Sequence, residues 1–321
     1  MLLLNKIIDL VSEDLAKVED SLKSVGEVQD NHLSELLNYV LASGGKRIRP
    51  ALTLLSGKFY HYGLDCLLRM AVAVELLHTA TLVHDDVIDE SVVRRGRPTI
   101  NDIWREDKAV LLGDYLFARA AEVCASTGNL RVIKLFSKTL ATISTGELNQ
   151  ACDAFNLDQT RERYFNRISK KTASLFVLAA ESGAILSQAP ERSVEILREY
   201  GHNLGIAFQI VDDILDFTGT EEELGKPVGS DLAQGTLTLP AMLLLERCGE
   251  DNPVREFFHN RNPENKRQVI ELIRNSPIIQ ECYDVAANYC ARARQNLNLL
   301  PDNASRQALI DLADYIAGRR K

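Results

Sequence analysis

Aromatic residues are scarce in this 321-residue chain, at 6% of positions, and no stretch of useful length alternates apolar with polar residues as a half-buried strand would. Long segments with apolar residues three and four positions apart occur instead. With 45% hydrophobic residues available for a core, these patterns predict an all-α protein. The sequence also lacks a linker, an internal repeat and a low-complexity tract, so we expect residues 1–321 to form a single domain.

Other absences argue against whole classes of protein. The net charge of −8 argues against a nucleic-acid-binding surface. The six cysteines form no CxxC pair, so we expect reduced thiols in a soluble, cytoplasmic protein without zinc or disulfides. The apolar N-terminus lacks the basic residues of a signal peptide, and no run of about 18 uncharged apolar residues predicts a transmembrane segment. A GxxxxGK[ST] loop and a kinase signature are also missing, which disfavours nucleotide phosphoryl transfer.

Helical periodicity, interrupted by glycine and proline, divides the chain into segments. In the first half, helices are expected at about 4–24, 32–42, 51–62, 65–90, 101–125 and 130–153. Thr160 is expected to cap the next helix, which runs to a break at 188–190, and a further helix begins at 191. Residues 218–235 form a long glycine-rich loop, either a lid or a solvated connector. Four or five shorter helices fill 236–318.

Three aspartates carry the strongest chemical signal. Asp85, Asp86 and Asp89 stand at i, i+1 and i+4, so at about 100° per residue they share one arc of a helix. A lone DDxxD is ordinarily an acidic, solvated helix end, but residues 72–83 are almost wholly apolar and place these aspartates at the end of a buried helix. Such a cluster repels itself unless cations lie between the oxygens, and hard oxygen ligands favour Mg²⁺.

A second copy of the same spacing occurs at Asp212, Asp213 and Asp216, again at the end of an apolar run. Two facing clusters predict a metal clamp. Arg94 and Arg95 follow the first cluster closely and suit phosphate oxygens through forked, charge-assisted hydrogen bonds. Together these residues predict a pocket for Mg²⁺ and a diphosphate.

A glycine-rich basic loop adds to this pattern. Gly44 and Gly45 end a predicted helix and are followed by Lys46, Arg47 and Arg49. Alone, this loop would be weak evidence for an anion site, because a charged loop after a helix is common. Its value lies in its combination with the two aspartate clusters.

A function of a different class deserves weight, because Glu75 and His78, and again Glu199 and His202, have the Glu-x-x-His spacing of di-iron carboxylate bundles. That hypothesis leaves all six aspartates without a role. It also needs two further buried glutamates that the sequence does not identify. We therefore rank it below the Mg²⁺ and diphosphate hypothesis.

In order and spacing, the motifs between residues 44 and 240 resemble those of the trans-type (all-E) isoprenyl diphosphate synthases. The resemblance implies a single all-α domain around a deep central cavity, usually in a homodimer, with a second, non-identical subunit left open. It implies ionisation of an allylic diphosphate, attack on the cation by isopentenyl diphosphate, and loss of a proton. It also implies three Mg²⁺ ions, two on the first aspartate motif and one on the second. Terpene cyclases of related fold usually carry an Asn/Ser/Glu pattern in the second motif, so elongation is favoured over cyclisation.

The resemblance assigns roles residue by residue. The metal ligands would be Asp85, Asp86, Asp89, Asp212, Asp213 and Asp216. The ligands and polar neighbours of the allylic diphosphate would be Arg94, Lys171, Thr172, Gln209 and Lys226. The isopentenyl diphosphate pocket would contain Lys46, Arg49, His78 and Arg95. The residues most directly tied to catalysis would be Asp85, Asp86, Asp89, Arg94, Lys171, Asp212, Asp213 and Lys226, with Glu147 and Gln150 on the cavity wall.

Two further features concern the product and the diphosphate. Ala80 and Thr81, one turn deeper than the first aspartates, are small where short-chain bacterial members tend to have an aromatic residue, and Leu77 and Phe136 are candidates for a deeper floor. The resemblance is therefore to medium- or long-chain synthases that make quinone side chains, with a farnesyl or geranylgeranyl diphosphate synthase as the alternative. Many members have lysine after Gly235, where this chain has Thr236. One cationic contact to diphosphate is thus missing.

Overall fold

The computed structural model describes residues 2–221, 227–249 and 252–320, so Lys226 lies outside the described residues. The described residues are mainly helical with one two-stranded hairpin, and the all-α prediction is confirmed. The elements of the first half are α1 (Leu2–Ile8), η1 (Asp9–Val11), α2 (Ser12–Val25), α3 (Asn31–Leu41), α4 (Ile48–Gly57), α5 (Leu64–Ile88), β1 (Val93–Arg94), β2 (Arg97–Pro98), α6 (Ile100–Trp104), α7 (Glu106–Ala125) and α8 (Leu130–Cys152). Those of the second half are α9 (Arg161–Ile168), the π-helical segment η2 (Ser169–Ala173), α10 (Ser174–Leu186), α11 (Glu191–Thr218), α13 (Ser230–Ala233), α14 (Leu239–Arg247), α15 (Pro253–Asn260), α16 (Pro263–Arg274), α17 (Ile278–Gln295), η3 (Leu297–Leu299) and α18 (Ala304–Ala317).

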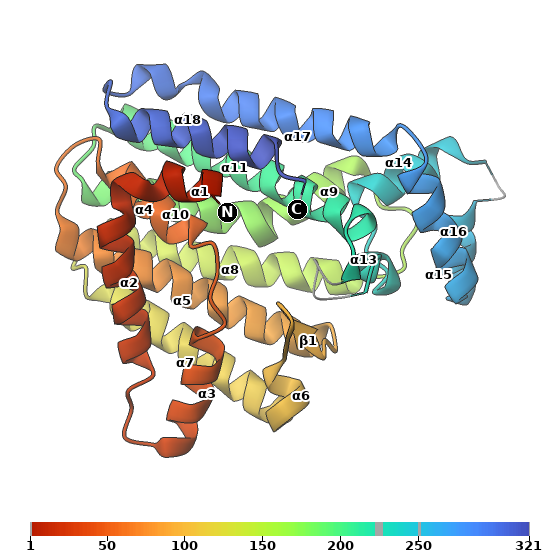
Figure 1. The fold of residues 1–321 in the computed structure, drawn as a ribbon, viewed down its shortest axis with the longest axis horizontal. Coiled ribbons are helices and arrows are strands. Elements are labelled where there is room, and N and C mark those ends of the chain that lie inside the picture. Colours follow the sequence, from red (N-terminus) through yellow and green to blue (C-terminus); the bar gives the residue numbers. More distant parts are fainter. Residues whose placement is uncertain (1, 222–226, 250–251, 321) are drawn as a thin grey trace.

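The helix α5 lies within the bundle (Figure 1). It is apolar on all sides, as expected of a helix that is packed all round, and residues 70–77 are all buried. Among the described helices, only α5 is long and apolar enough to cross a membrane, yet 67% of its apolar window is buried inside the protein. Burial in the core accounts for its composition.

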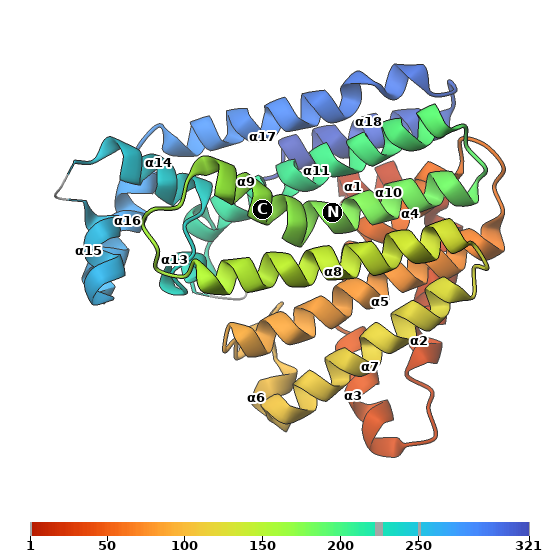
Figure 2. The same ribbon diagram turned by 180° about the vertical axis from the view of Figure 1, so that it is seen from behind.

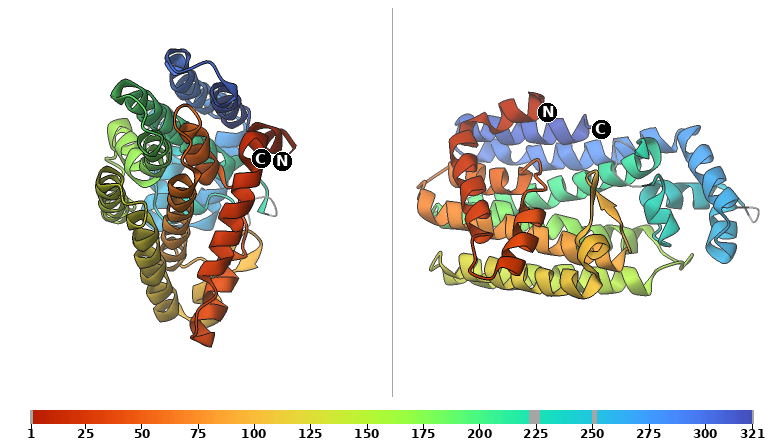
Figure 3. Two further views of the ribbon diagram at one scale, coloured as in Figure 1. Left: turned by 90° about the vertical axis from the view of Figure 1, so that its left-hand side faces the viewer. Right: turned by 60° about the horizontal axis from the view of Figure 1, so that its bottom comes forward.

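The remaining long helices pack on one another in a series that leads away from α5. α7 packs on α5, α8 on both α7 and α10, α11 on α10, and α17 on α11, an arrangement that can be followed in Figure 2. α4 packs against both α5 and α10. The two ends of the described chain lie close together (Figure 3), where α1 packs against α18.

The buried apolar residues form two clusters, and α11 belongs to both. Its Leu204 and Ala207 join a cluster formed mainly by α2, α4, α5, α10 and α18, whereas Ile210 and Ile214 join one formed by α9, α14, α16 and α17. Since α11 ends in the second aspartate motif, packing on both clusters fixes the position of that motif.

Several helix boundaries match the predictions because side chains cap them. The Oγ1 of Thr160 accepts a hydrogen bond from the backbone N–H of Arg163 (3.3 Å). Three predicted helices are interrupted: 4–24 by η1, 101–125 at Arg105, whose φ is 79°, and the helix after Thr160 by η2. The hairpin at 93–98 was not predicted, because two-residue strands are too short to show an alternating pattern.

Candidate active site

A cavity of about 890 Å³ opens between α2, α4, α5, α8, η2 and α11. It brings together residues that are far apart in sequence, including one aspartate from each motif. The predicted site residues that line it are Lys46, Arg49, His78, Thr81, Asp85, Arg94, Arg95, Glu147, Lys171, Thr172, Gln209 and Asp212.

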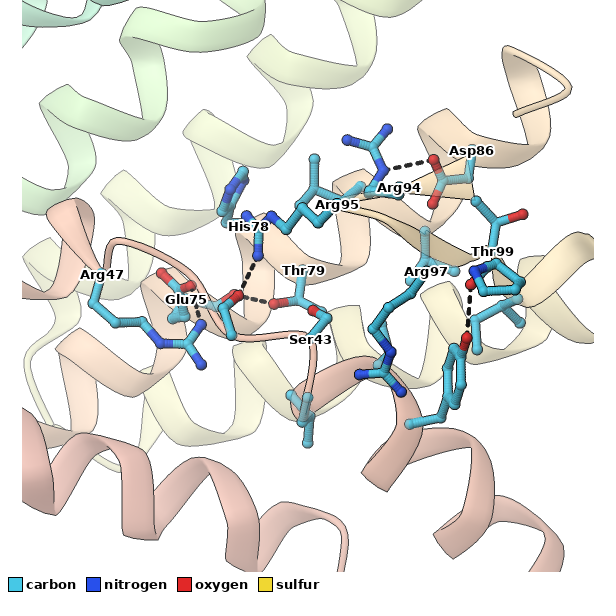
Figure 4. Close-up of a pocket in the computed structure, with 18 residues that line it drawn as sticks. Ser43, Arg47, Glu75, His78, Thr79, Asp86, Arg94, Arg95, Arg97 and Thr99 are labelled. Atoms are coloured by element: carbon cyan, nitrogen blue, oxygen red, sulfur yellow. Dashed lines mark hydrogen bonds and ion pairs between the residues drawn. The ribbon is translucent and has the colours of Figure 1, made fainter. Parts of the chain in front are cut away.

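The other predicted residues lie around this cavity rather than in it. A smaller polar cleft of about 100 Å³ is lined by Asp89, Gln150, Asp213 and Thr236, and it shares Lys171, Thr172 and Gln209 with the cavity. Asp86 lines a third pocket with His78, Arg94 and Arg95, shown in Figure 4. Asp216 lines none of the three.

The first aspartate motif lies at the C-terminal end of α5, with Asp89 as its C-cap. Asp86 is buried, and its Oδ1 accepts a hydrogen bond from Arg94 Nε at 2.6 Å (Figure 4). Burial raises the pKa of Asp86 to about 6, with Asp85 and Asp89 adding repulsion that Arg94 opposes. Burial also raises the pKa of Asp89. A cation placed between these oxygens would relieve both effects.

Lys171 projects from η2 and faces the first motif from the opposite wall. A π-turn inside a helix often marks a functional site, and Gly146 of α8 permits its close approach, since a Cβ there would lie 3.2 Å from the backbone nitrogen of Lys171. The Nζ of Lys171 donates to Glu147 Oε2 at 2.9 Å. Burial alone would lower the pKa of Lys171, but Asp85 and Glu147 raise it, so the ammonium stays charged.

In the second motif, Asp213 is fixed by two donors. Its Oδ1 accepts from Gln209 Nε2 at 2.8 Å and its Oδ2 from the hydroxyl of Tyr164 at 2.7 Å. The Oε1 of Gln209 accepts in turn from Thr172 Oγ1 at 2.5 Å. Burial, followed by repulsion from Asp231, raises the pKa of Asp213 to about 7 despite these donors.

The outer two aspartates of the second motif have different partners. Asp212 Oδ1 accepts from Arg319 at 2.6 Å, near the end of the chain. Asp216, 1% exposed, accepts from Ser230 Oγ at 2.9 Å and from the backbone N–H of Asp231 at 3.3 Å. Asp216 therefore holds the start of α13 against α11.

The donor set fits Mg²⁺, although the carboxylates surround a space rather than a point. Among residues 2–221, 227–249 and 252–320, no three His, Cys, Asp or Glu side chains converge as a ready-made metal site. Mg²⁺ is usually bound by only one or two carboxylates, with the other positions taken by water and substrate phosphates. The same observation gives no support to the di-iron alternative. Glu75 is 5% exposed and is paired with Arg47 Nη1 at 2.5 Å.

That pairing also fixes the basic loop. Arg47 has a left-handed backbone, with φ of 48°, and its guanidinium donates to both Glu19 on α2 and Glu75 on α5. The loop is held from the other side by Arg95, which donates to the carbonyl of Gly44 (Figure 4). Lys46 and Arg49 are thereby anchored on either side of Arg47.

Arg49 and His78 both line the cavity close to further arginines. The Nε of Arg49 is buried and has no hydrogen-bond partner among the described residues, while its Cζ lies 4.7 Å from the ring centroid of Phe176. Burial lowers the pKa of Arg49 to about 10, so it remains a cation at neutral pH. Burial, Arg49 and Arg95 together hold the pKa of His78 well below its usual range. His78 is therefore a neutral hydrogen-bonding group beside two cations.

The four predicted chain-length residues are not equivalent. Thr81 lines the cavity, but Ala80, Leu77 and Phe136 are at most 3% exposed and do not line it. Whether a residue of α5 faces the cavity depends on its angular position around the helix axis as well as on its depth along that axis. At about 100° per residue, Ala80 lies roughly 160° around the helix from His78, which does face the cavity, whereas Thr81 lies only about 60° away. Of the two residues predicted to form the first wall, Thr81 lines the cavity in this structure, and the part of Ala80 in that wall stays a prediction.

Some residues at the site gave no recognisable signal in the sequence. Arg319 approaches Asp212 from the end of the chain and lies with its Cζ 5.1 Å from the ring centroid of Phe208. Glu19 and Tyr164 reach the site from helices without a recognisable motif. Only Arg47 lay inside a motif, where its position between Lys46 and Arg49 could have suggested a supporting role.

Comparison with known proteins agrees with this geometry. Residues 30–275 match the polyprenyl synthetase family. Heptaprenyl diphosphate synthase component 2 from Geobacillus stearothermophilus is 42% identical over 320 residues, covering 98% of this chain and 99% of that protein. The polyprenyl synthase from Caulobacter crescentus CB15, complexed with calcium and isoprenyl diphosphate, has a TM-score of 0.95 and 35% identity, with 99% of this chain and 98% of that one covered. Heptaprenyl diphosphate synthase from Staphylococcus aureus has a TM-score of 0.93 and 38% identity, covering 97% of this chain and 99% of that one. The chain therefore belongs to the polyprenyl synthetase family of prenyltransferases, and the resemblance inferred from its motifs is confirmed.

Proposed function

We propose that this protein condenses isopentenyl diphosphate with an allylic diphosphate to make an all-trans polyprenyl diphosphate of medium or long chain, as a precursor of a quinone side chain. The observation that carries the proposal is a single cavity lined by carboxylates from both aspartate motifs and by enough cations for two diphosphates. Asp85 and Asp212 line it together with Lys171, and Lys46 and Arg49 provide cations for a second diphosphate. The names of the heptaprenyl diphosphate synthases described above support the product class.

Each group of residues has a distinct part in the proposed reaction. Lys171 and Arg94 bind the allylic diphosphate, while Thr172 and Gln209 orient its oxygens. Lys46, Arg49, Arg95 and neutral His78 bind isopentenyl diphosphate so that its double bond lies beside the allylic carbon. Apolar side chains of the cavity keep water from the cation, and the released diphosphate takes the proton, since no protein base is evident among the residues that the structure describes.

The metal proposal follows from the carboxylates. Family members generally use Mg²⁺, and we propose three ions, held by Asp85, Asp86 and Asp89 on one side and by Asp212, Asp213 and Asp216 on the other. When bound, Mg²⁺ would supply positive charge that stabilises the departing diphosphate. Asp216 is the least exposed of these ligands and would have to exchange its contact with Ser230. Lys226 stays a predicted allylic diphosphate ligand outside the described residues.

For product length, we propose that the growing chain passes Thr81. Thr81→Phe should narrow the cavity and shift the products toward farnesyl or geranylgeranyl size, because close-packed walls do not yield easily. Ala80→Phe is the matched variant one position away on the same helix. If Ala80 points away from the cavity, Ala80→Phe should lower the stability of the protein rather than shorten the product. A shorter product from Ala80→Phe alone would show instead that the growing chain passes Ala80.

We further propose that the whole chain acts as one domain in a cytoplasmic homodimer. All six cysteines are free thiols, which suits a reducing compartment. Leu111 on α7 and Leu130 and Leu148 on α8 are 63%, 64% and 67% exposed, and burial of such side chains favours association. The Geobacillus relative is named component 2, so a second subunit is the alternative partner. Light scattering of the purified chain distinguishes dimer from monomer.

The test of the function is incubation of the purified protein with Mg²⁺, isopentenyl diphosphate and farnesyl diphosphate. We expect a polyprenyl diphosphate to form and its formation to stop in EDTA. Iron binding without product formation would instead favour the di-iron alternative.

A further inference from the structure

The polar cleft beside the main cavity contains a buried arginine that no motif singled out. Arg167 on α9 is 7% exposed and lines this cleft. Its Nη1 donates to Gln159 Oε1 at 2.8 Å and its Nη2 to the carbonyl of Leu237 at 2.6 Å. Both acceptors are neutral, and within the described part of the chain no carboxylate is close enough to pair with it. Arg167 acts on the nearby Asp213 through space without pairing with it, and three of its five N–H donors remain for other partners.

A second, independent observation comes from the residue that follows Leu237. Thr238 is 2% exposed and lines the same cleft, and its Oγ1 is buried without a hydrogen-bond partner among the described residues. Thr238 is the N-cap residue of α14, yet its side chain makes no capping bond. A buried hydroxyl without a partner is costly, so a polar ligand is expected beside it. The N-terminus of α14 adds partial positive charge at this point.

The position of the cleft indicates which ligand this is. It is bordered by Asp89 from the first aspartate motif, by Asp213 from the second and by Asp231, and Lys171 lines both this cleft and the main cavity. Thr236 also lines it and brings a hydroxyl without charge. Cations and hydroxyl donors with carboxylates at the edge suit phosphate oxygens and their accompanying metal.

We propose that this cleft receives one phosphate group of the allylic diphosphate and that Arg167 binds it, supplying the positive charge that Thr236 does not. The proposal rests on the proposed function for the identity of the substrate. It assigns Arg167 a direct contact with the substrate, whereas a purely structural Arg167 would only join Gln159 to Leu237.

The substrate-binding and structural roles of Arg167 can be separated by removing its positive charge and adding one at position 236. Arg167→Gln should raise the KM for farnesyl diphosphate and the Kd for inorganic pyrophosphate with Mg²⁺ by about tenfold or more, because a charge-assisted hydrogen bond is lost. The KM for isopentenyl diphosphate should change by less than about twofold. Thr236→Lys, added to Arg167→Gln, should recover most of the loss by returning an ammonium to the cleft. A lysine at 236 does not replace the link between Gln159 and Leu237, so a structural role predicts no recovery.

Gln159→Leu is the matched control, since it removes one partner of Arg167 and keeps the guanidinium. Its pyrophosphate affinity should stay within about twofold of wild type. An equal loss in Gln159→Leu and Arg167→Gln, without recovery by Thr236→Lys, would overturn the proposal.

Two single variants decide the matter if Arg167→Gln does not fold. Thr238→Val removes a hydroxyl that makes no bond in the structure and should weaken pyrophosphate binding about threefold, whereas Thr236→Lys should strengthen it. Unchanged calorimetric affinity in both variants would show that the cleft holds only water. Failure of the wild-type protein to elongate farnesyl diphosphate would count against the proposed function instead, because pyrophosphate binding is scored without turnover.

Discussion

The two aspartate motifs have the same spacing but different surroundings. Asp85, Asp86 and Asp89 end α5, and among the residues that the structure describes only Asp86 accepts a side-chain hydrogen bond, from Arg94. In the second motif, Asp212, Asp213 and Asp216 all accept such bonds, from Arg319, from Gln209 and Tyr164, and from Ser230.

The difference shows that two aspartate motifs with the same spacing can differ in how firmly their carboxylates are held. Asp85 faces the cavity and Asp89 the cleft, and within the described residues no other side chain holds either carboxylate by a hydrogen bond. Hydrogen bonds hold the carboxylates of the second motif in place without a ligand. They therefore fix one side of the space that the ligand must fill. The following experiments test whether this contrast matters for catalysis.

The largest effect is expected where each motif meets the main cavity. Asp85→Ala and Asp212→Ala should each lower kcat by roughly 10²-fold or more, because each removes a group that positions charge against the departing diphosphate. Steady-state kinetics at saturating Mg²⁺ measures this. Asp65→Ala, at the exposed start of the same helix α5, is the control and should behave as wild type. Near-normal rates in both motif variants would exclude the metal clamp.

A smaller effect should separate the two sets of cations that line the cavity. Lys171→Ala, opposite the first motif, should act on the KM for the allylic substrate or on kcat, by about tenfold. Arg95→Ala and His78→Ala should raise mainly the KM for isopentenyl diphosphate by a similar factor. Initial rates with each substrate varied in turn distinguish the patterns. The same pattern in all three variants would contradict the assignment of two diphosphate pockets.

The second motif should also make stability depend on pH. The pKa of Asp213 is about 7 in the folded protein against an ordinary 3.8, so the folded state binds the extra proton between these values. Without Mg²⁺, stability should therefore fall as pH rises from about 4 to 7. Asp213→Asn should remove this part of the decline and melt a few degrees above wild type at pH 8, but near it at pH 5. Equal Tm differences at both pH values would argue against a buried charge at Asp213.

The smallest effect is expected from Tyr164→Phe, which removes one donor to Asp213. Stability should fall by about 1 kcal/mol, with a few-fold loss of kcat from a less constrained carboxylate. Tyr200→Phe is a matched control, because its buried hydroxyl donates to the carbonyl of Leu309. The control should lose similar stability and keep its kcat. If Tyr164→Phe keeps full kcat, rigidity of the second motif is not needed.

The sequence was informative where local periodicity decides the outcome. Asp85 and Asp212 could be placed at helix ends because an apolar run precedes each one, and Thr160 could be recognised as a cap. Arg105 was not recognised as a break, because a left-handed backbone at arginine has no sequence signature.

Contacts between distant segments could not be predicted. Arg319 lies 107 residues beyond Asp212 and Tyr164 lies 49 before Asp213, so only the packing of α9 and α18 on α11 brings them together. The direction in which Ala80 faces is a similar case. Its depth follows from the helical rise, but the direction in which it faces depends on neighbouring helices.

The central claim, that the chain elongates prenyl diphosphates through a cavity beneath the first aspartate motif, is tested most directly by the product-length distribution of the wild-type protein. Farnesyl diphosphate and isopentenyl diphosphate are supplied with Mg²⁺, and the dephosphorylated products are separated by chromatography. We predict all-trans products longer than geranylgeranyl, formed only when Mg²⁺ is present. Products that stop at geranylgeranyl size, or turnover that continues in EDTA, would contradict the account.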